Sequence, residues 1–303
     1  MRVALTGSTG FVGGAVLRRL LRRGHEVRAL VRDPDRAGHL TDHRGVEIVA
    51  GHLKDDEALR RLMEGADAAV HLVGIIVEVA GQTFEGIHVT ATARLVTAAR
   101  SAGVGRFVHM SALGARPDPE ATAYHRTKAA GEEVVRGGDV PYAILRPSLI
   151  AGQGNVPLKM MCNMIRFAPA VPVIGDGRYR MQPVWLEDVA EAFAVAVEQP
   201  EIQGTFDIAG PDQLTWHDML DLVERSLGVR RRRVSVPVGL ARFAALGGLV
   251  LPELAPLTPD QLQMLLEGNT TDSHELESVF GVRPRRFADV VGEACARYVQ
   301  TNR

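Results

Sequence analysis

The stretch Thr6-Gly7-Ser8-Thr9-Gly10-Phe11-Val12-Gly13 decides the fold. It follows a short apolar run, Arg2–Thr6, and opens a segment, Phe11–Arg23, whose apolar residues recur with the period of a helix. Of its glycines, the first permits the tight turn, the second lets backbone approach a pyrophosphate, and the third lets the helix pack on the strand. We therefore predict a dinucleotide-binding turn. Its expected contact residues are Gly7, Ser8, Thr9, Gly10, Phe11, Val12 and Gly13.

Beyond this turn, the first half of the chain alternates apolar runs with amphipathic segments. Such alternation implies right-handed crossovers and a parallel sheet covered on both faces. We therefore predict an α/β fold with a doubly wound parallel sheet of the Rossmann type. The expected strands are Arg2–Thr6, Glu26–Val31, Glu47–Ala50, Ala68–Val73, Arg106–Met110 and Tyr142–Arg146, and the expected helices are Phe11–Arg23, Asp55–Glu64, Phe84–Ala102 and Ala121–Arg136.

The alternation ends after Pro147, where Gly, Pro and Met become frequent. We expect residues 1–147, with 183–200 returning to them, to form the Rossmann domain. Residues 148–182 and 201–303 are expected to form a smaller, mainly helical C-terminal lobe for a substrate or partner. The elements expected after Pro147 are helices at Glu187–Glu198, Trp216–Ser226, Val238–Leu249, Pro259–Glu267 and Phe287–Val299, and a strand at Thr205–Ile208.

The net charge, the cysteines and the length of the apolar runs limit the classes of function that the chain can have. The formal net charge of −1 gives no electrostatic case for nucleic acid. Two cysteines, Cys162 and Cys295, lie far apart in the sequence, which favours a reducing compartment over a disulfide framework. No apolar run reaches the roughly 18 residues of a membrane-spanning helix, and no signal peptide is evident. We expect a cytoplasmic protein. The ten histidines show no metal-ligand spacing, so no metal is expected.

The end of the second predicted strand bears on the choice of dinucleotide. An acidic residue there would hydrogen-bond the ribose 2′-hydroxyl of NAD, whereas an arginine suits the 2′-phosphate of NADP. The chain places Arg32 just after the predicted strand and Asp33 next. We predict that NADP(H) is preferred. NAD(H) stays open, with Arg32 as a solvated loop residue and Asp33 at the ribose.

Tyr124 and Lys128 stand four residues apart on a predicted helix, so they share one face. An ammonium beside a phenol favours the phenolate and lowers a pKa that is ordinarily about 10. The pair is therefore predicted to act as a general acid/base.

Together these features resemble the short-chain dehydrogenase/reductase superfamily in its extended form, which includes nucleotide-sugar epimerases and dehydratases. The resemblance covers nearly the whole chain. It makes Tyr124 the catalytic acid/base and Lys128 the residue that binds the nicotinamide ribose. It also implies cofactor contacts from His52, Leu53, Leu72, Val73, Gly74, Pro147, Ser148, Leu149 and Ile150.

Several positions depart from that superfamily. The slot of the catalytic Ser or Thr falls on Ala112, with Ser111 one residue early, and Ser111 is kept as a candidate catalytic residue. The helical Asn falls on His88, and the acid that often meets adenine falls on His52. The resemblance therefore implies an incomplete catalytic set.

Four segments resemble one atypical branch of the superfamily, which contains the dinucleotide-binding accessory subunit of respiratory complex I and bacterial relatives named as nucleoside-diphosphate-sugar epimerases. They are Val108–Ala115, Tyr124–Lys128, Gln182–Val184 and Pro256–Gln261. Two functions stay open. One is an NAD(P)-dependent oxidoreductase or epimerase acting on an unknown small or quinone-like substrate. The other is a non-catalytic NADP(H)-binding accessory or scaffold protein.

Arg230 to Arg233 form a cationic run just before the mainly apolar helix expected from Val238. One interpretation is an exposed loop or strand edge followed by a helix packed on the core. The other is a surface for a protein partner or an anionic membrane, which would place the protein at the inner face of that membrane. Both interpretations stay open, as does the oligomeric state.

Overall fold

The structure is a computed structural model that describes residues 1–37, 40, 43–79, 81–247 and 257–300. Pro256 and the end of the helix expected at Val238–Leu249 lie outside these residues. The chain forms two compact units. The first contains Met1–Pro147, Glu187–Ile208 and His274–Arg283, and the second contains Ser148–Leu186, Ala209–Ser273 and Pro284–Arg303.

The first unit is built on a seven-stranded sheet in which every pair of neighbours is parallel. The strand order β11-β6-β5-β4-β1-β2-β3 reverses direction between β1 and β4. This confirms the predicted doubly wound fold, whose ligand crevice lies outside the carboxyl ends of the strands at that reversal. The strands are β1 Arg2–Thr6, β2 Glu26–Val31, β3 Val46–Ala50, β4 Ala68–His71, β5 Phe107–Met110, β6 Tyr142–Pro147 and β11 Gly204–Ile208.

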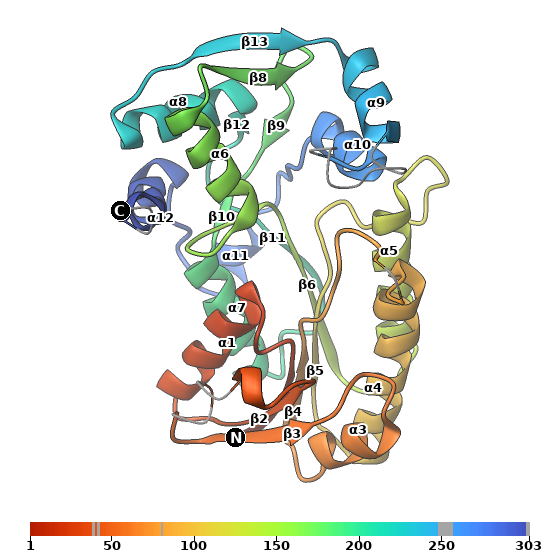
Figure 1. Cartoon of the computed structure of the whole chain (residues 1–303). Helices are drawn as coiled ribbons and strands as arrows, with labels where there is room; N and C mark the ends of the chain where they lie inside the picture. Colours follow the sequence, from red (N-terminus) through yellow and green to blue (C-terminus); the bar gives the residue numbers. More distant parts are fainter. Residues whose placement is uncertain (38–39, 41–42, 80, 248–256, 301–303) are drawn as a thin grey trace. The chain divides into compact units, whose positions relative to one another are not determined.

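Helices cover both faces of this sheet, with α3, α4 and α5 on one face and α1 and α7 on the other (Figure 1). The first face buries an apolar cluster that includes Leu62, Leu95 and Phe107. Capping side chains fix where helices begin, since Asp55 accepts a hydrogen bond from the Ala58 N–H and Thr122 accepts one from the His125 N–H. The helices are α1 Phe11–Arg22, α3 Asp56–Met63, the π-helix η2 Glu85–Thr90, α4 Ala91–Ser101, α5 Ala123–Arg136, α7 Leu186–Glu198 and α11 Glu275–Ser278, with a 3₁₀ turn η1 at Asp35–Ala37.

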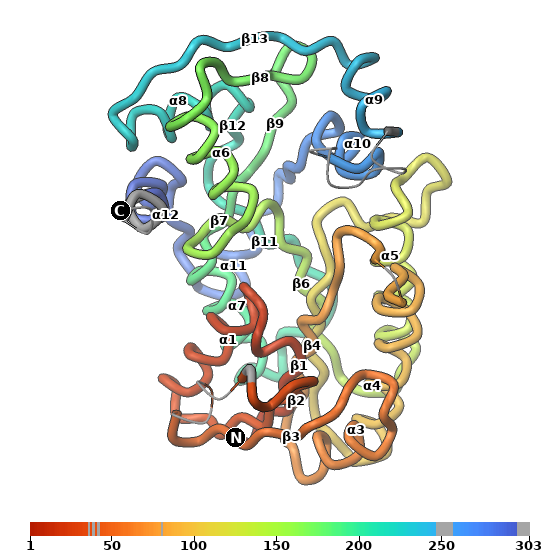
Figure 2. The backbone as a smooth tube through the Cα atoms, in the orientation of Figure 1, coloured from red at the N-terminus to blue at the C-terminus, as the bar shows by residue number. Residues whose placement is uncertain are grey.

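The returning segment begins and ends later than the expected 183–200, since it covers Glu187–Ile208 and its strand β11 joins the central sheet (Figure 2). Residues 201–208 were expected in the C-terminal lobe, but Gly204–Ile208 pairs with β6 in parallel. The buried guanidinium of Arg106 donates to the carbonyls of Ala196, Pro200 and Ile202, which lie at and just beyond the end of α7. These bonds tie the returning segment to the sheet.

The second unit is mainly helical, as expected, and also contains short strands that the sequence analysis did not predict. Its longest pair is the parallel ladder of β8 and β13, and its core includes Ile165, Leu220 and Phe287. Cys162 and Cys295 also meet in this core as free thiols with their sulfur atoms 2.7 Å apart, although they are distant in sequence. The elements are β7 Ile150–Ala151, α6 Val156–Phe167, β8 Ala170–Ile174, β9 Arg180–Met181, β10 Val184–Trp185, β12 Leu214–Thr215, α8 Trp216–Leu227, β13 Arg232–Val236, α9 Val238–Gly247, α10 Pro259–Glu267 and α12 Phe287–Gln300.

Within the described ranges, no helix combines the length and the apolar character that crossing a bilayer requires.

Candidate functional site

The glycine turn after β1 is a close-packed cradle. Gly7 has φ +85°, a left-handed conformation that favours glycine. A Cβ on Gly13 would lie 1.8 Å from the Gly7 carbonyl oxygen. Only glycine at position 13 therefore lets α1 pack this closely against the turn. The helix begins at Phe11 with no side-chain cap on Gly10 and no acid in its first turn. Its first N–H groups and its positive dipole end are therefore available to a phosphate.

Ser8 supplies a second reason why the turn fits a dinucleotide. The residue is 1% exposed, and its hydroxyl has no hydrogen-bond partner among the described residues. A buried hydroxyl without a partner costs about 1–3 kcal/mol. The residues present therefore fit the pyrophosphate of a dinucleotide, which would give both this hydroxyl and the uncapped helix end a partner.

The end of β4 lies directly against this turn. A Cβ on Gly7 would lie 3.2 Å from the carbonyl carbon of Leu72 and 3.3 Å from the nitrogen of Val73. The following residue, Gly74, faces α5, since a Cβ there would lie 3.8 Å from the Lys128 Nζ. The structure thus brings the glycine turn, the segment 72–74 and Lys128 into one continuous row within the first unit.

The residues expected near the adenosine half follow β2 and β3. Arg32 is exposed directly after β2, and it makes no hydrogen bond or ion pair with another described residue. His52 is exposed after β3, where its Nδ1 accepts a hydrogen bond from the Lys54 N–H at 3.2 Å. Leu53 packs against the apolar core beside α3. Of these three side chains, Arg32 is the one that carries charge and has no partner within the described chain.

Tyr124 lies in the first turn of α5, with its ring packed against other aromatic groups. The ring centroid is 5.5 Å from that of His88 and 6.0 Å from that of Phe84, both in edge-on geometry. No described residue hydrogen-bonds the Tyr124 hydroxyl. Burial raises the pKa of Tyr124 to about 12, because a phenolate loses its hydration there. This is the opposite of the lowering that the Tyr–Lys spacing predicted.

Lys128 lies one turn further along the same face of α5, and its side chain is buried. Its Nζ donates to the Met110 carbonyl at 2.6 Å, at the end of β5. Burial lowers the pKa of Lys128 to about 8, against an opposing effect of the Glu132 carboxylate. The ammonium is therefore held at the carboxyl ends of the strands and keeps its proton at neutral pH.

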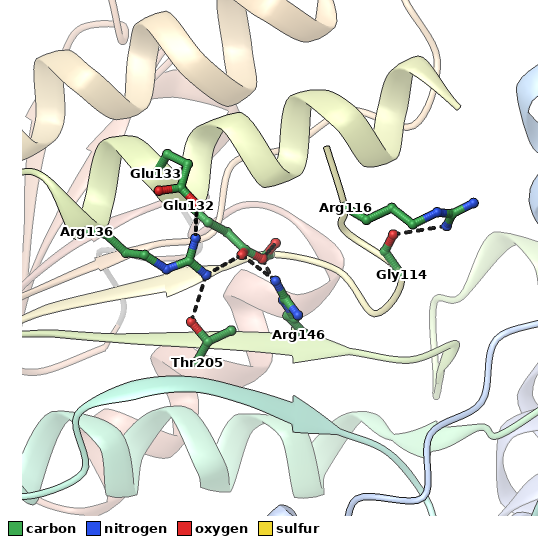
Figure 3. Close-up of polar contacts among 8 residues, drawn as sticks. Gly114, Arg116, Glu132, Glu133, Arg136, Arg146 and Thr205 are labelled. Atoms are coloured by element: carbon green, nitrogen blue, oxygen red, sulfur yellow. Dashed lines mark hydrogen bonds and ion pairs between the residues drawn. The ribbon is translucent and has the colours of Figure 1, made fainter. Parts of the chain in front are cut away.

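The Ser111 hydroxyl is hydrogen-bonded to a buried carboxylate. It donates to Glu132 Oε1 at 2.5 Å, and Glu132 is completely buried. Arg146 donates to both oxygens of the same carboxylate at 2.7 and 2.6 Å, and Arg136 donates at 2.8 Å (Figure 3). The Ser111 proton is thus committed to a buried carboxylate, and Ala112, 8% exposed, holds the expected catalytic slot.

Glu132 is a residue that the sequence analysis missed. Burial raises the pKa of its carboxyl, but the hydrogen bonds from Arg146 and Ser111 outweigh burial and lower it below the ordinary value. The sequence did hold a signal, because Glu132 follows Tyr124 and Lys128 at the same four-residue spacing and so lies on the inward face of α5.

His88 stands where the superfamily places an asparagine, and the structure gives it two partners. Its Nε2 accepts a hydrogen bond from the Ile75 N–H at 3.2 Å, so Nδ1 carries the proton and donates to the Thr127 hydroxyl at 3.0 Å. Burial, with the nearby charge of Lys128, lowers the pKa of His88 to about 3. The π-helix places its carbonyl so close to α5 that a Cβ on Gly131 would lie 2.4 Å away.

The cofactor contacts expected at residues 147–150 are divided between the two units. Pro147 ends β6 in the first unit, where its carbonyl accepts a hydrogen bond from the Leu113 N–H at 2.9 Å. Ser148, Leu149 and Ile150 belong to the second unit, where the Ser148 hydroxyl donates to the Gln182 carbonyl.

Comparison with known proteins gives a consistent family. Residues 7–162 match the family described as NAD(P)H-binding. The chain is 31% identical to ceramide reductase of Caulobacter vibrioides over 78% of this chain and 73% of that protein. It is 30% identical to sterol demethylase protein B of Methylococcus capsulatus over 96% of this chain and 97% of that protein.

A mitochondrial protein and a solved structure are also similar. The NADH dehydrogenase (ubiquinone) 1 alpha subcomplex subunit 9 of Rattus norvegicus is 30% identical over 78% of this chain, which spans 63% of that relative's length. The structure of UDP-glucose 4-epimerase from Thermotoga maritima superposes with a TM-score of 0.77 at 18% identity, over 100% of both chains. At that identity, the likeness shows the shared fold.

Proposed function

The chain belongs to the NAD(P)H-binding family, as an atypical extended short-chain dehydrogenase/reductase, and on that premise we propose that it is a working NADP(H)-dependent reductase. The observation that carries the proposal is the row formed by the glycine turn, Gly74 and Lys128 in one unit, with Tyr124 one turn from Lys128 on α5. The row therefore places the phosphate-binding turn in the same unit as Tyr124, the side chain that would transfer a proton.

The cofactor would be held from two sides. The turn Gly7–Gly13 and the Ser8 hydroxyl would bind the pyrophosphate, and Arg32 would pair with the 2′-phosphate that distinguishes NADP from NAD. Support for Arg32 is its exposed position after β2 without a partner among the described residues. When bound, the nicotinamide supplies or accepts a hydride.

Tyr124 would act as the acid. With a pKa of about 12, its hydroxyl keeps its proton at neutral pH and can give it to a carbonyl oxygen that is being reduced. Lys128 would hold the nicotinamide ribose, one helical turn from Tyr124 on α5. At neutral pH, Tyr124 is therefore in the protonated form that carbonyl reduction requires of its acid.

The substrate class is inferred from the relatives. Two of them, the ceramide reductase and the sterol demethylase protein, are named for lipids. We infer that this chain reduces a carbonyl group on a lipid or similarly apolar molecule. Hydride would add to the carbonyl carbon, and the Tyr124 proton would go to the oxygen, so that one alcohol and one oxidised cofactor are formed.

One observation favours a second function, that of a cofactor-binding accessory protein. The Ser111 hydroxyl donates its hydrogen bond to Glu132. This removes one candidate donor for polarising a substrate carbonyl. Losing one such donor costs a factor of about 10² to 10³ in rate. The rat mitochondrial relative, named as a subunit of NADH dehydrogenase, is consistent with this alternative.

A turnover experiment separates the two functions. NADPH oxidation would be followed with a panel of long-chain and sterol ketones, with the wild type and with Tyr124→Phe. The reductase proposal expects ketone-dependent oxidation that falls by a factor of about 10² or more in Tyr124→Phe, with NADPH affinity unchanged. Tight NADPH binding without turnover on any ketone would contradict the reductase and support the accessory function.

A further inference from the structure

The helix α9 in the second unit presents an apolar face to solvent. Leu240, Phe243 and Leu246 are 59%, 75% and 55% exposed, and their three-residue spacing places them on one side of the helix. The opposite side is the one that packs, where Ala245 is 3% exposed. The interpretation in which this helix packs on the core therefore holds for one of its faces only.

The strand before α9 continues this surface. β13 leads directly into α9 along one edge of the second unit (Figure 1). Val234, in β13, is 47% exposed, and Arg232, two residues earlier, is exposed on the same side of the strand. Four of the ten large apolar side chains that are exposed among the described residues lie in β13 and α9, so the apolar exposure is concentrated there.

The segment that contains β13 and α9 carries charges of one sign only. Residues 228–247 contain five arginines and no acidic residue. Two of the arginines serve the fold, because Arg231 donates to the Ile165 and Arg166 carbonyls at the end of α6, and Arg233 pairs with Asp221 and Glu224. The other three are exposed and have no ion pair within the described chain: Arg230, Arg232 and Arg242.

We propose that β13 and α9 form a docking surface for an anionic lipid membrane. Apolar side chains on one face of a helix enter the boundary between headgroups and acyl chains, while flanking arginines pair with lipid phosphates. The exposed Leu and Phe side chains of α9 match the first requirement, and the three unpaired arginines match the second.

The charge pattern argues against a second copy of this chain as the occupant. In a symmetric dimer, the same patch faces itself, so arginines would face arginines in a desolvated interface. An anionic bilayer has no such conflict, since it offers phosphates at the rim and apolar chains at the centre. The surface goes beyond the proposed reductase function and does not depend on it.

The test is co-sedimentation of the purified chain with vesicles. Vesicles of phosphatidylcholine with phosphatidylglycerol would be compared with vesicles of phosphatidylcholine alone, at low and high salt. The proposal expects binding to the anionic vesicles at low salt that weakens at high salt. Substituting Arg230, Arg232 and Arg242 together by Gln should weaken binding by up to about a hundredfold, since each cation near the surface contributes about fivefold.

Apolar variants test the insertion itself. The triple substitution Leu240→Ser, Phe243→Ser and Leu246→Ser should abolish sedimentation with vesicles without lowering the melting temperature, because these side chains are exposed. Ile76→Ser is the matched control, since Ile76 in the first unit is 54% exposed, and it should bind like the wild type. Failure of the wild type to bind anionic vesicles at low salt would overturn the proposal. Wild-type self-association that the triple variant abolishes would overturn it in favour of a second copy.

Discussion

The Ser111 hydroxyl donates to the carboxylate of Glu132, 2.5 Å away, on the inward face of α5. Because Glu132 is completely buried and also binds two arginines, this contact fixes the chain after β5 to the helix that carries Tyr124 and Lys128. The arrangement gives Ser111 a structural role beside the candidate site.

The Ser111→Ala variant separates a structural role from a catalytic one. Loss of the hydrogen bond to a charged group should lower the free energy of unfolding by about 1.5–3 kcal/mol. In ketone reduction, kcat/KM should change by less than about tenfold, because the hydroxyl already donates its proton to Glu132. Urea denaturation and steady-state kinetics check the two effects. A loss of activity as large as that of Tyr124→Phe would mean that Ser111 turns toward the substrate after all.

The buried carboxylate itself should be essential to the fold. Glu132→Gln leaves Arg146 and Arg136 without their shared anion, and breaking a buried pair costs about 3–5 kcal/mol. Because both guanidinium groups are about a quarter to a third exposed, the expected loss in the free energy of unfolding is near the lower end. Glu133→Gln is the control: Glu133 is 73% exposed on the same helix and also pairs with Arg136, so its loss should stay within about 1 kcal/mol. Equal losses in the two variants would contradict this account.

Gly13 and Gly14, two neighbouring glycines of α1, should differ sharply in how well they tolerate substitution by alanine. A Cβ on Gly13 would meet the Gly7 carbonyl oxygen at 1.8 Å, whereas the nearest atom to a Cβ on Gly14 is the flexible Arg18 Nη1 at 3.4 Å. We expect Gly13→Ala to displace the turn, lower the melting temperature and weaken NADPH binding at least about tenfold. Gly14→Ala should be neutral or stabilising by up to about 1 kcal/mol. Calorimetric titration of both variants would show whether the close packing of the turn matters for binding.

Acid should destabilise the protein through three buried histidines. Burial lowers the pKa of His71 and of His88 to about 3, and that of His109 well below its ordinary value. The folded chain therefore keeps these rings neutral, while the unfolded chain takes up protons below about pH 6.5. The free energy of unfolding should fall with pH from there toward about pH 3, by up to about 1.4 kcal/mol per pH unit for each histidine.

His88→Asn isolates one of these contributions. The variant should show a shallower loss of stability with falling pH, by about 1.4 kcal/mol per unit over this range, whatever its stability at neutral pH. His43→Asn, at an exposed position, should leave the slope unchanged. Denaturation curves at several pH values measure the slopes, and parallel profiles for His88→Asn and the wild type would mean that His88 is protonated in the folded chain.

Local patterns sufficed to predict the strands between residues 2 and 147 and the helices that separate them, because these strands are short and largely apolar and the helices show the apolar period of 3.6 residues. They failed for β8 and β13, where Pro172 and a run of arginines hide a two-stranded ladder at the edge of the second unit. They also failed for β11, whose membership of the central sheet depends on pairing with the distant β6.

The residues of the candidate site also fall into two groups, those that spacing within one element predicted and those whose partners come from elsewhere in the chain. The glycine turn and the Tyr–Lys pair follow from spacing within one element, so the sequence alone indicated them. The partners of Ser111 and His88 come from other elements, at Glu132 and at Ile75 and Thr127. The direction of the Tyr124 pKa was mispredicted for the same reason, since burial by Phe84 and His88 depends on tertiary packing.

The most direct test of the central claim is calorimetric titration of the purified chain with NADPH and NADH, repeated with Arg32→Ala. The account predicts that the wild type binds NADPH more tightly than NADH, and that Arg32→Ala removes this preference while NADH affinity stays the same. Failure of both dinucleotides to bind the wild type would contradict the assignment of the glycine turn as a cofactor site.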